Sequence, residues 1–306
     1  MKLLTCLPTL LFALLCLSLP STVAAGPEGE TKREGRVDAD PALWVFRDED
    51  TTIYLFGTVH LLKPGLSWFD DGIAKAFDSS DKLMMEILPF DDKAALEPAI
   101  MQLAQDPSGR TMAQRLSADD HAAYKKRLNE MGVATEQLES FEPWFVSMTV
   151  MVIDYLQRGF SMDSGAEKVL ENAAKSASKT ISAFETAEEQ MRMLDSIPEA
   201  EQVAGLMAFV RNGEELMGRM DKLIAHWAAG EAEAAGKLLH AEMAQTPESA
   251  RIMLTDRNKR WAEQLIRRLD KPGTVFVAVG TGHLIGDDSV QSLLRARGIE
   301  VEQVHY

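Results

Sequence analysis

Residues 53–62 read IYLFGTVHLL, and residues 276–285 read FVAVGTGHLI. In both stretches an apolar run leads into the same motif, Gly-Thr-x-His-Leu. An uninterrupted apolar run of this length is typical of a strand that is buried on both faces, as in a parallel sheet. The two stretches therefore predict two buried strands that end alike, in Gly57, Thr58 and His60 in the first copy and in Gly280, Thr281 and His283 in the second.

The residues that follow each motif also match. A helical pattern with apolar residues on one face comes next, and it leads to a further strand pattern, at residues 82–87 after the first motif and at residues 299–304 after the second. Before the first motif, residues 42–56 have the pattern of a β-hairpin with a polar turn near residues 48–51. We therefore predict an α/β protein whose mixed sheet is built from two βαβ halves lying side by side, each carrying one motif.

The segment between these halves is mainly helical by pattern. Residues 94–268 carry apolar residues at i, i+3 and i+4 spacing, with Gly or Pro between the runs, and one strand pattern that ends at Glu185. The whole chain has 306 residues, of which 46% are hydrophobic, so it can bury a sizeable core. We predict a single domain over residues 41–306, in which the helical middle forms a cap over a crevice at the sheet.

The first 25 residues have the pattern of an export signal. Lys2 precedes an apolar run, and small residues at positions 23–25 suit cleavage after Ala25. Residues 26–40 are rich in Gly, Pro and charge, and they predict a disordered linker. We expect a periplasmic or secreted protein that has no stable membrane insertion once the leader is removed.

Cysteine content and charge exclude several kinds of site. Both cysteines, Cys6 and Cys16, lie in the leader, so the mature chain has no disulfide, no cysteine-bound zinc and no cysteine nucleophile. The net charge is −15 at pH 7, and we find no basic run with interleaved aromatic residues. Such a surface repels phosphate backbones, so we expect no nucleic-acid partner.

The repeated motif predicts a site where the two strands end. Ligand sites in parallel α/β sheets form outside the carboxyl ends of the strands, so His60 and His283 should face one crevice. Glu86 ends the apolar strand pattern at residues 82–87, where an acid is costly unless it is paired or bound to a metal. Two imidazoles and a carboxylate can hold a divalent metal with a position left for water, so we expect zinc, manganese or cobalt there. The supporting residues are the motif glycines, which permit sharp turns and close approach, and the motif threonines, which can hydrogen-bond the turns: Gly57, Thr58, Gly280 and Thr281.

Several pieces of the chain occur in a recognisable order: YLFGTVHLL, MME, FEPW, AFETAEEQMRMLD, DRNKRWA and VFVAVGTGHLIG. Together they resemble the TraB/PrgY/GumN superfamily, and within it the exported bacterial GumN-like branch. This superfamily includes the Tiki metalloproteases, and its fold is similar to the erythromycin-esterase and ChaN-like proteins. The resemblance implies the same pair of histidines with Glu86, and it adds three residues to the site: Arg257 and Asn258 from a further family motif, and Glu185 as a site carboxylate.

The chain departs from the family pattern at two places. Ala183 stands where the family has a glycine, and Gly165-Ala166-Glu167 replaces its usual Gly-Val-Asp stretch. We expect both departures to lie away from the two histidines.

Three functions remain open from the sequence. The first is a metal-dependent hydrolase, most readily a peptidase acting on a peptide or protein, with Arg257 steadying the substrate or a developing oxyanion. The second is a periplasmic haem- or metal-binding protein without catalysis. The third is an interaction protein of the envelope or of polysaccharide export. The chain has no HExxH helix, so a standard zinc-protease site is excluded.

Overall fold

A mixed six-stranded sheet forms the centre of the protein. The computed structural model describes residues 36–88 and 93–306, so the predicted leader and most of the predicted linker lie outside it. The strand order is β6-β5-β7-β3-β2-β8. The prediction of an α/β protein with a mixed sheet is confirmed, and the strands are β2 (Leu43–Arg47), β3 (Thr51–Thr58), β5 (Lys82–Ile87), β6 (Thr180–Glu185), β7 (Gly273–Gly280) and β8 (Glu302–Val304).

The two predicted βαβ halves interleave instead of lying side by side. Strands β3, β5, β6 and β7 are parallel, and β7 lies between β3 and β5. Strand β2 pairs antiparallel with both β3 and β8, so the expected hairpin is confirmed and β8 lies beyond it. The run from Val275 to Val279 is apolar throughout and almost fully buried, which suits β7 to a central position covered on both faces.

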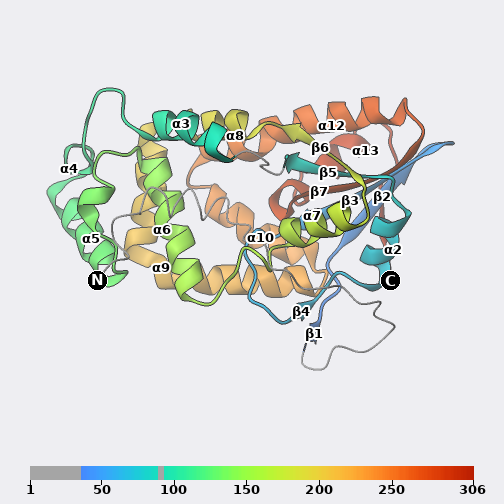
Figure 1. Ribbon diagram of the computed structural model, residues 1–306, viewed down its shortest axis with the longest axis horizontal. Helices are drawn as coiled ribbons and strands as arrows, with labels where there is room; N and C mark the ends of the chain where they lie inside the picture. Colours follow the sequence, from blue (N-terminus) through green and yellow to red (C-terminus); the bar gives the residue numbers. More distant parts are fainter. Residues whose placement is uncertain (1–35, 89–92) are drawn as a thin grey trace.

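Helices cover both faces of the sheet (Figure 1). One face packs against α2 (Asp71–Ser79), α7 (Ala166–Ser176) and Trp227 near the end of a long helix, α9 (Glu199–Ala228). The other face packs against α12 (Asp256–Leu269) and α13 (Val290–Arg295). The carboxyl ends of the parallel strands consequently open at one edge, between these layers.

The helical middle builds a hydrophobic core of its own, centred on residues such as Tyr124, Trp144 and Phe209. It lies beside the edge of the sheet at which the parallel strands end (Figure 1). Buried Arg115 pairs with Asp106, Glu142 and Glu199 and ties its helices together. The remaining elements of this part and its return to the sheet are α3 (Lys93–Ala104), α4 (Met112–Arg115), α5 (Ala118–Glu130), η1 (Thr135–Gln137), α6 (Pro143–Gln157), α8 (Ala187–Asp195), α10 (Ala232–Met243), α11 (Pro247–Ala250), η2 (Arg251–Thr255) and η3 (Thr281–Leu284).

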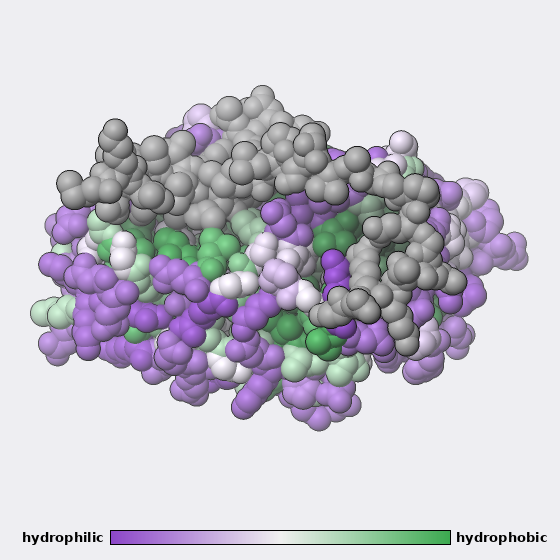
Figure 2. Space-filling view, turned by 60° about the horizontal axis from the view of Figure 1, so that its bottom comes forward, coloured by the Kyte–Doolittle hydropathy of each residue, from purple (hydrophilic) through white to green (hydrophobic). Residues whose placement is uncertain are grey.

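The packed structure begins inside the predicted linker. Strand β1 (Val37–Asp38) pairs in parallel with β4 (Leu66–Ser67), and Ala39 is buried. Among the described residues, no helix combines the length and the apolar character that crossing a membrane requires. On the face shown in Figure 2, hydrophilic residues cover most of the described surface, and hydrophobic ones form a band across its middle.

Candidate functional site

The two Gly-Thr-x-His-Leu motifs interlock at the carboxyl ends of β3 and β7. Thr58 lies opposite Gly280 in the parallel ladder, and Thr281 Oγ1 donates a hydrogen bond to the carbonyl of Thr58 at 2.9 Å. A Cβ atom on Gly57 would stand 3.0 Å from Thr281 Oγ1 and 3.3 Å from Thr281 Cα. The glycine of the first motif is therefore needed because the second motif passes directly over it.

The two motif histidines lie in different environments. His283 is part of the short helix η3, and its side chain is only 5% exposed, whereas the side chain of His60 is 72% exposed. The two copies also differ at the third motif position. It is Gly282 in the second copy, where a Cβ would stand 2.8 Å from the side chain of Leu239, and Val59 in the first. The ring of His283 lies against Trp261 of α12, with the ring centres 4.3 Å apart.

Glu86 is held as a buried carboxylate at the end of β5. Oε1 accepts a hydrogen bond from the backbone N–H of Gly280 at 2.6 Å, and Oε2 accepts from Arg257 Nη2 at 2.6 Å and from Gln190 Nε2 at 3.2 Å. Burial opposes ionisation, but the nearby His283 ring, the charges of Arg257 and His60, and the hydrogen bond from Gly280 lower the pKa of Glu86 to about 2. A Cβ on Gly280 would be 3.0 Å from Oε1, so the second motif also needs its glycine for this approach.

Arg257 is the centre of the buried contacts. Its side chain is 3% exposed, and Nε donates to Glu185 Oε2 at 3.0 Å while Nη1 donates to the carbonyl of Met253 at 3.1 Å. Its guanidinium carbon lies 4.5 Å from the ring centre of Trp261, which in turn donates to Glu185 from Nε1. Glu185 thus fixes both the cation and the ring beneath it.

The ring of His283 is oriented by Asn258. Asn258 Nδ2 donates to the carbonyl of Asp288, so its Oδ1 faces Nδ1 of His283 at 2.6 Å. Nδ1 therefore carries the proton, and Nε2 accepts from Arg257 Nη1 at 3.0 Å. Burial, opposed by Glu86 and reinforced by Arg257, lowers the pKa of His283 to about 3, so its ring is neutral at pH 7.

His60 has a carboxylate partner, Glu167, which was expected to lie away from the histidines. Its Nδ1 lies 2.7 Å from Oε1 of Glu167, in the first turn of α7, and this carboxylate raises the pKa of His60. The turn approaches closely, because a Cβ on Gly165 would stand 2.0 Å from the carbonyl oxygen of His60. The expectation that Gly165-Ala166-Glu167 lies away from the histidines is therefore wrong.

Most of the predicted site residues contact one another, whereas His60 contacts a different residue. Arg257 contacts Glu86, Glu185 and His283, and Asn258 contacts His283. The described contacts of His60 are instead with Glu167, although its charge influences the pKa of Glu86. Glu167, Gln190 and Trp261 also belong to these contacts and were not predicted from the sequence. The position of Trp261, one helical turn after Arg257, is the signal that could have identified it.

Two of the three predicted metal ligands lie close together. Nε2 of His283 and Oε1 of Glu86 are 3.6 Å apart, and two ligands at about 2 Å from one tetrahedral ion are separated by roughly 3.4 Å. Over the residues that the structure describes, no group of three His, Cys, Asp or Glu side chains stands close enough to hold a metal ion.

Fold and site together define an α/β protein with a buried histidine, glutamate and arginine site at the carboxyl edge of its sheet. The family model for the TraB/PrgY/gumN family matches residues 42–303, and the chain belongs to this family. An uncharacterized protein of Treponema pallidum (strain Nichols) is 24% identical over 83% of this chain and 80% of its own length. The uncharacterized protein YbaP of Escherichia coli (strain K12) is 21% identical over 83% of this chain and 92% of its own length. No solved structure matches the chain.

Proposed function

We propose that this protein is a metal-dependent hydrolase of peptide bonds that works at Glu86, His283 and His60. The observation that carries the proposal is the oxygen atom that lies against Nδ1 of each histidine. Nδ1 of His60 lies 2.7 Å from a carboxylate oxygen of Glu167 as an ion pair, and Nδ1 of His283 is hydrogen-bonded to Oδ1 of Asn258 at 2.6 Å. Histidines that bind metals are held in this way by an oxygen atom, which leaves Nε2 as the ligand.

The donor types fit a divalent cation such as zinc, manganese or cobalt. His283 is neutral at pH 7 and Glu86 is ionised, which are the protonation states that ligands need. His283 and Glu86 would hold the cation. Glu167 raises the pKa of His60 to about 9, so His60 of the adjoining motif would have to release its Nε2 proton to serve as the third ligand. A bound cation supplies a water of lowered pKa and polarises a carbonyl group.

Arg257 is suited to stabilise the negative charge that develops on a substrate oxygen. A guanidinium has five N–H groups. Four of them have partners here, namely Glu185, Met253, His283 and Glu86, which leaves one N–H on Nη2. Because Glu185 and Trp261 hold the group rigidly, it needs little reorganisation when the charge forms.

Burial favours this proposal over a haem-binding role. The side chain of His283 is 5% exposed, and its ring lies against Trp261 with the ring centres 4.3 Å apart. A flat porphyrin has no access to Nε2 in that position. We also infer a peptide or protein substrate and a periplasmic or secreted location, both carried by the family resemblance and the predicted leader.

Metal content and peptide cleavage test the proposal together. We expect the purified chain to contain a stoichiometric divalent metal that is lost in His283→Ala and His60→Ala, together with cleavage of a peptide library in zinc, manganese or cobalt. His121→Ala is the matched control, because His121 also lies 2.7 Å from a carboxylate, Glu139, but in the helical part. No metal and no cleavage under any of the three ions would refute the proposal. A haem absorption band that is lost in both variants would instead support the haem-binding function.

A further inference from the structure

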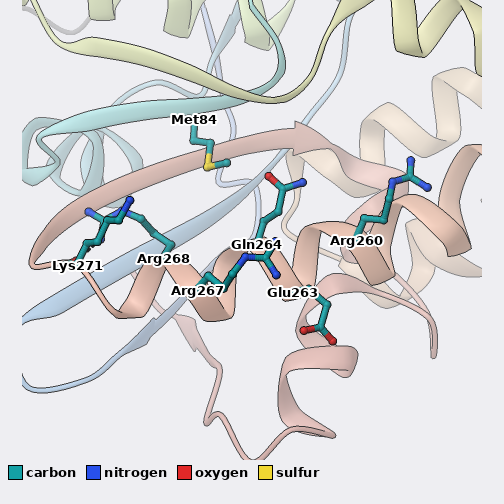
Figure 3. Close-up of a pocket in the computed structure, with 7 residues that line it drawn as sticks. All are labelled: Met84, Arg260, Glu263, Gln264, Arg267, Arg268 and Lys271. Atoms are coloured by element: carbon teal, nitrogen blue, oxygen red, sulfur yellow. Dashed lines mark hydrogen bonds between the residues drawn. The ribbon is translucent and has the colours of Figure 1, made fainter.

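A groove runs along α12 on the side that faces Met84 of β5, outside the candidate site. Its volume is about 530 Å³. Figure 3 shows basic side chains following one another along the helix and just beyond its end, with Met84 of β5 on the opposite side. The lining residues are Met84, Arg260, Glu263, Gln264, Arg267, Arg268 and Lys271.

The groove is cationic although the chain as a whole carries a net charge of −15. Its one carboxylate, on Glu263, points away from Met84 in Figure 3 and pairs with Arg297. Arg260 is likewise neutralised by Glu185. Among the described residues, the side chains of Arg267 and Lys271 have no ion-pair or hydrogen-bond partner, so their charges are available to a ligand.

Helix structure explains only part of this set of cations. Basic residues in the last turn complement the helix dipole, and Arg268 donates to the carbonyls of Lys271 and Pro272, which follow the helix. Arg267 makes no such contact and Lys271 lies outside the helix. Both line the groove together with the apolar side chain of Met84. This combination of side chains suits a ligand with charged and apolar parts.

We propose that this groove docks an acidic segment of an extended polypeptide. Its volume is too large for a single small anion, and no aromatic side chain lines it to stack on a sugar ring. Nucleic acid and anionic membranes extend beyond the groove and are repelled by the acidity of the remaining surface, whereas a short acidic segment contacts only the cationic groove. Arg260 is the one lining residue that contacts the candidate site, through its ion pair with Glu185. Docking in the groove therefore does not depend on hydrolysis at that site.

The spacing of the free cations defines the segment further. Arg267 lies in the last turn of α12, and Lys271 follows the end of this helix. Side chains at alternate positions of an extended peptide point to the same side and are roughly 6.6 Å apart. A segment with acidic residues at alternate positions can therefore present both carboxylates to the two cations, with an apolar residue able to reach Met84.

The direct test measures binding of a fluorescein-labelled peptide, Gly-Glu-Val-Glu-Gly-amide, to the full chain by fluorescence anisotropy. We expect Arg267→Ala with Lys271→Ala to weaken binding about 3- to 20-fold, the size of two exposed ion pairs. Raising the salt concentration should weaken binding to the wild type more than to this double variant. Both substitutions lie at the surface, and an unchanged Tm would establish that the fold is retained.

Three comparisons make the result specific. The peptide with Gln in place of both Glu residues should bind weakly to the wild type, and Lys125→Ala, an exposed lysine of α5, should bind the acidic peptide normally. Equal binding of the acidic and Gln peptides, or full binding by the double variant, would overturn the proposal. Arg267-dependent binding of an oligouronate or of anionic vesicles, with none of the peptide, would assign the groove to that ligand instead. Because anisotropy requires no turnover, these outcomes are independent of the peptidase assay.

Discussion

Among the residues that the structure describes, Arg257 is the only cation that touches both Glu86 and Glu185, and Arg257→Gln removes it. The side chains of the two acids are 9% and 6% exposed, so both carboxylates stay largely without solvent when their partner is removed. Removing one partner of a buried ion pair costs about 3–5 kcal/mol. The lowered pKa of Glu86 agrees in direction, because Arg257 is one of the groups that favour its ionised form. We therefore expect Arg257→Gln to reduce the free energy of unfolding by about 3–5 kcal/mol at pH 7.

The same reasoning predicts how this loss depends on pH. The folded-state pKa of Glu86 lies below the unfolded value, so its contribution is complete above pH 4.5 and declines as the pH falls towards 2. At pH 3 less than about half of the contribution from Glu86 remains, and the difference between wild type and variant should shrink accordingly.

Urea unfolding of both proteins in EDTA, followed by tryptophan fluorescence at pH 7 and pH 3, measures these differences. Arg260→Gln is the matched control, since Arg260 contacts the same Glu185 but is 51% exposed, and it should cost less than about 1 kcal/mol. A loss below about 1 kcal/mol for Arg257→Gln at pH 7, or the same loss at both pH values, would refute the reasoning.

Three further predictions concern the motif and its anchors. Asn258→Ala and Glu167→Ala should each weaken metal affinity by about 10- to 100-fold in calorimetric titrations, while Glu139→Ala, the partner of His121, should leave it unchanged. Glu167→Gln should lower the pKa of His60, which NMR measures by titrating the protons of its ring. In the wild type the His60–Glu167 pair stabilises the fold below pH 6.5, and this contribution disappears as the pH rises through the raised folded-state pKa of His60. Gly57→Ala should destabilise the fold by about 1–3 kcal/mol because its Cβ meets Thr281, whereas Gly205→Ala, in α9 with open space around it, should stabilise by about 0.5–1 kcal/mol; thermal unfolding distinguishes the two.

The strands and the pairing of the motifs were predictable because their signals are local. A continuous apolar run marks a buried parallel strand, and equal motifs after two such strands place Gly57 and Gly280 at the same edge. Strand order is a different kind of information. The position of β7 between β3 and β5 depends on pairing between segments some 200 residues apart, and no local pattern encodes that choice.

The partner of His60 was hidden for a related reason. An acid in the first turn of a helix is ordinary, because it complements the helix dipole, so Glu167 carries no local sign of a site. Its role appears only when Gly165 allows the turn of α7 to reach the first motif. Likewise, His283 is buried by contacts with Arg257, Asn258 and Trp261 of α12, a segment outside the motif, so the shared motif could not predict that His283 is buried and His60 exposed.

The contact between Arg257 and His283 links the proposed roles of the two residues. Nε2 of a neutral imidazole has one lone pair, and here it accepts from Arg257 Nη1. A cation held by Nε2 would take that lone pair, so Arg257 would keep Glu185, Met253 and Glu86 as partners and release one Nη1 N–H. Together with the unused N–H on Nη2, two donors of a rigid guanidinium then become available to a substrate oxygen. If a metal binds there, Arg257 would satisfy the site beforehand and present its free donors only afterwards, which would couple substrate activation to metal occupancy.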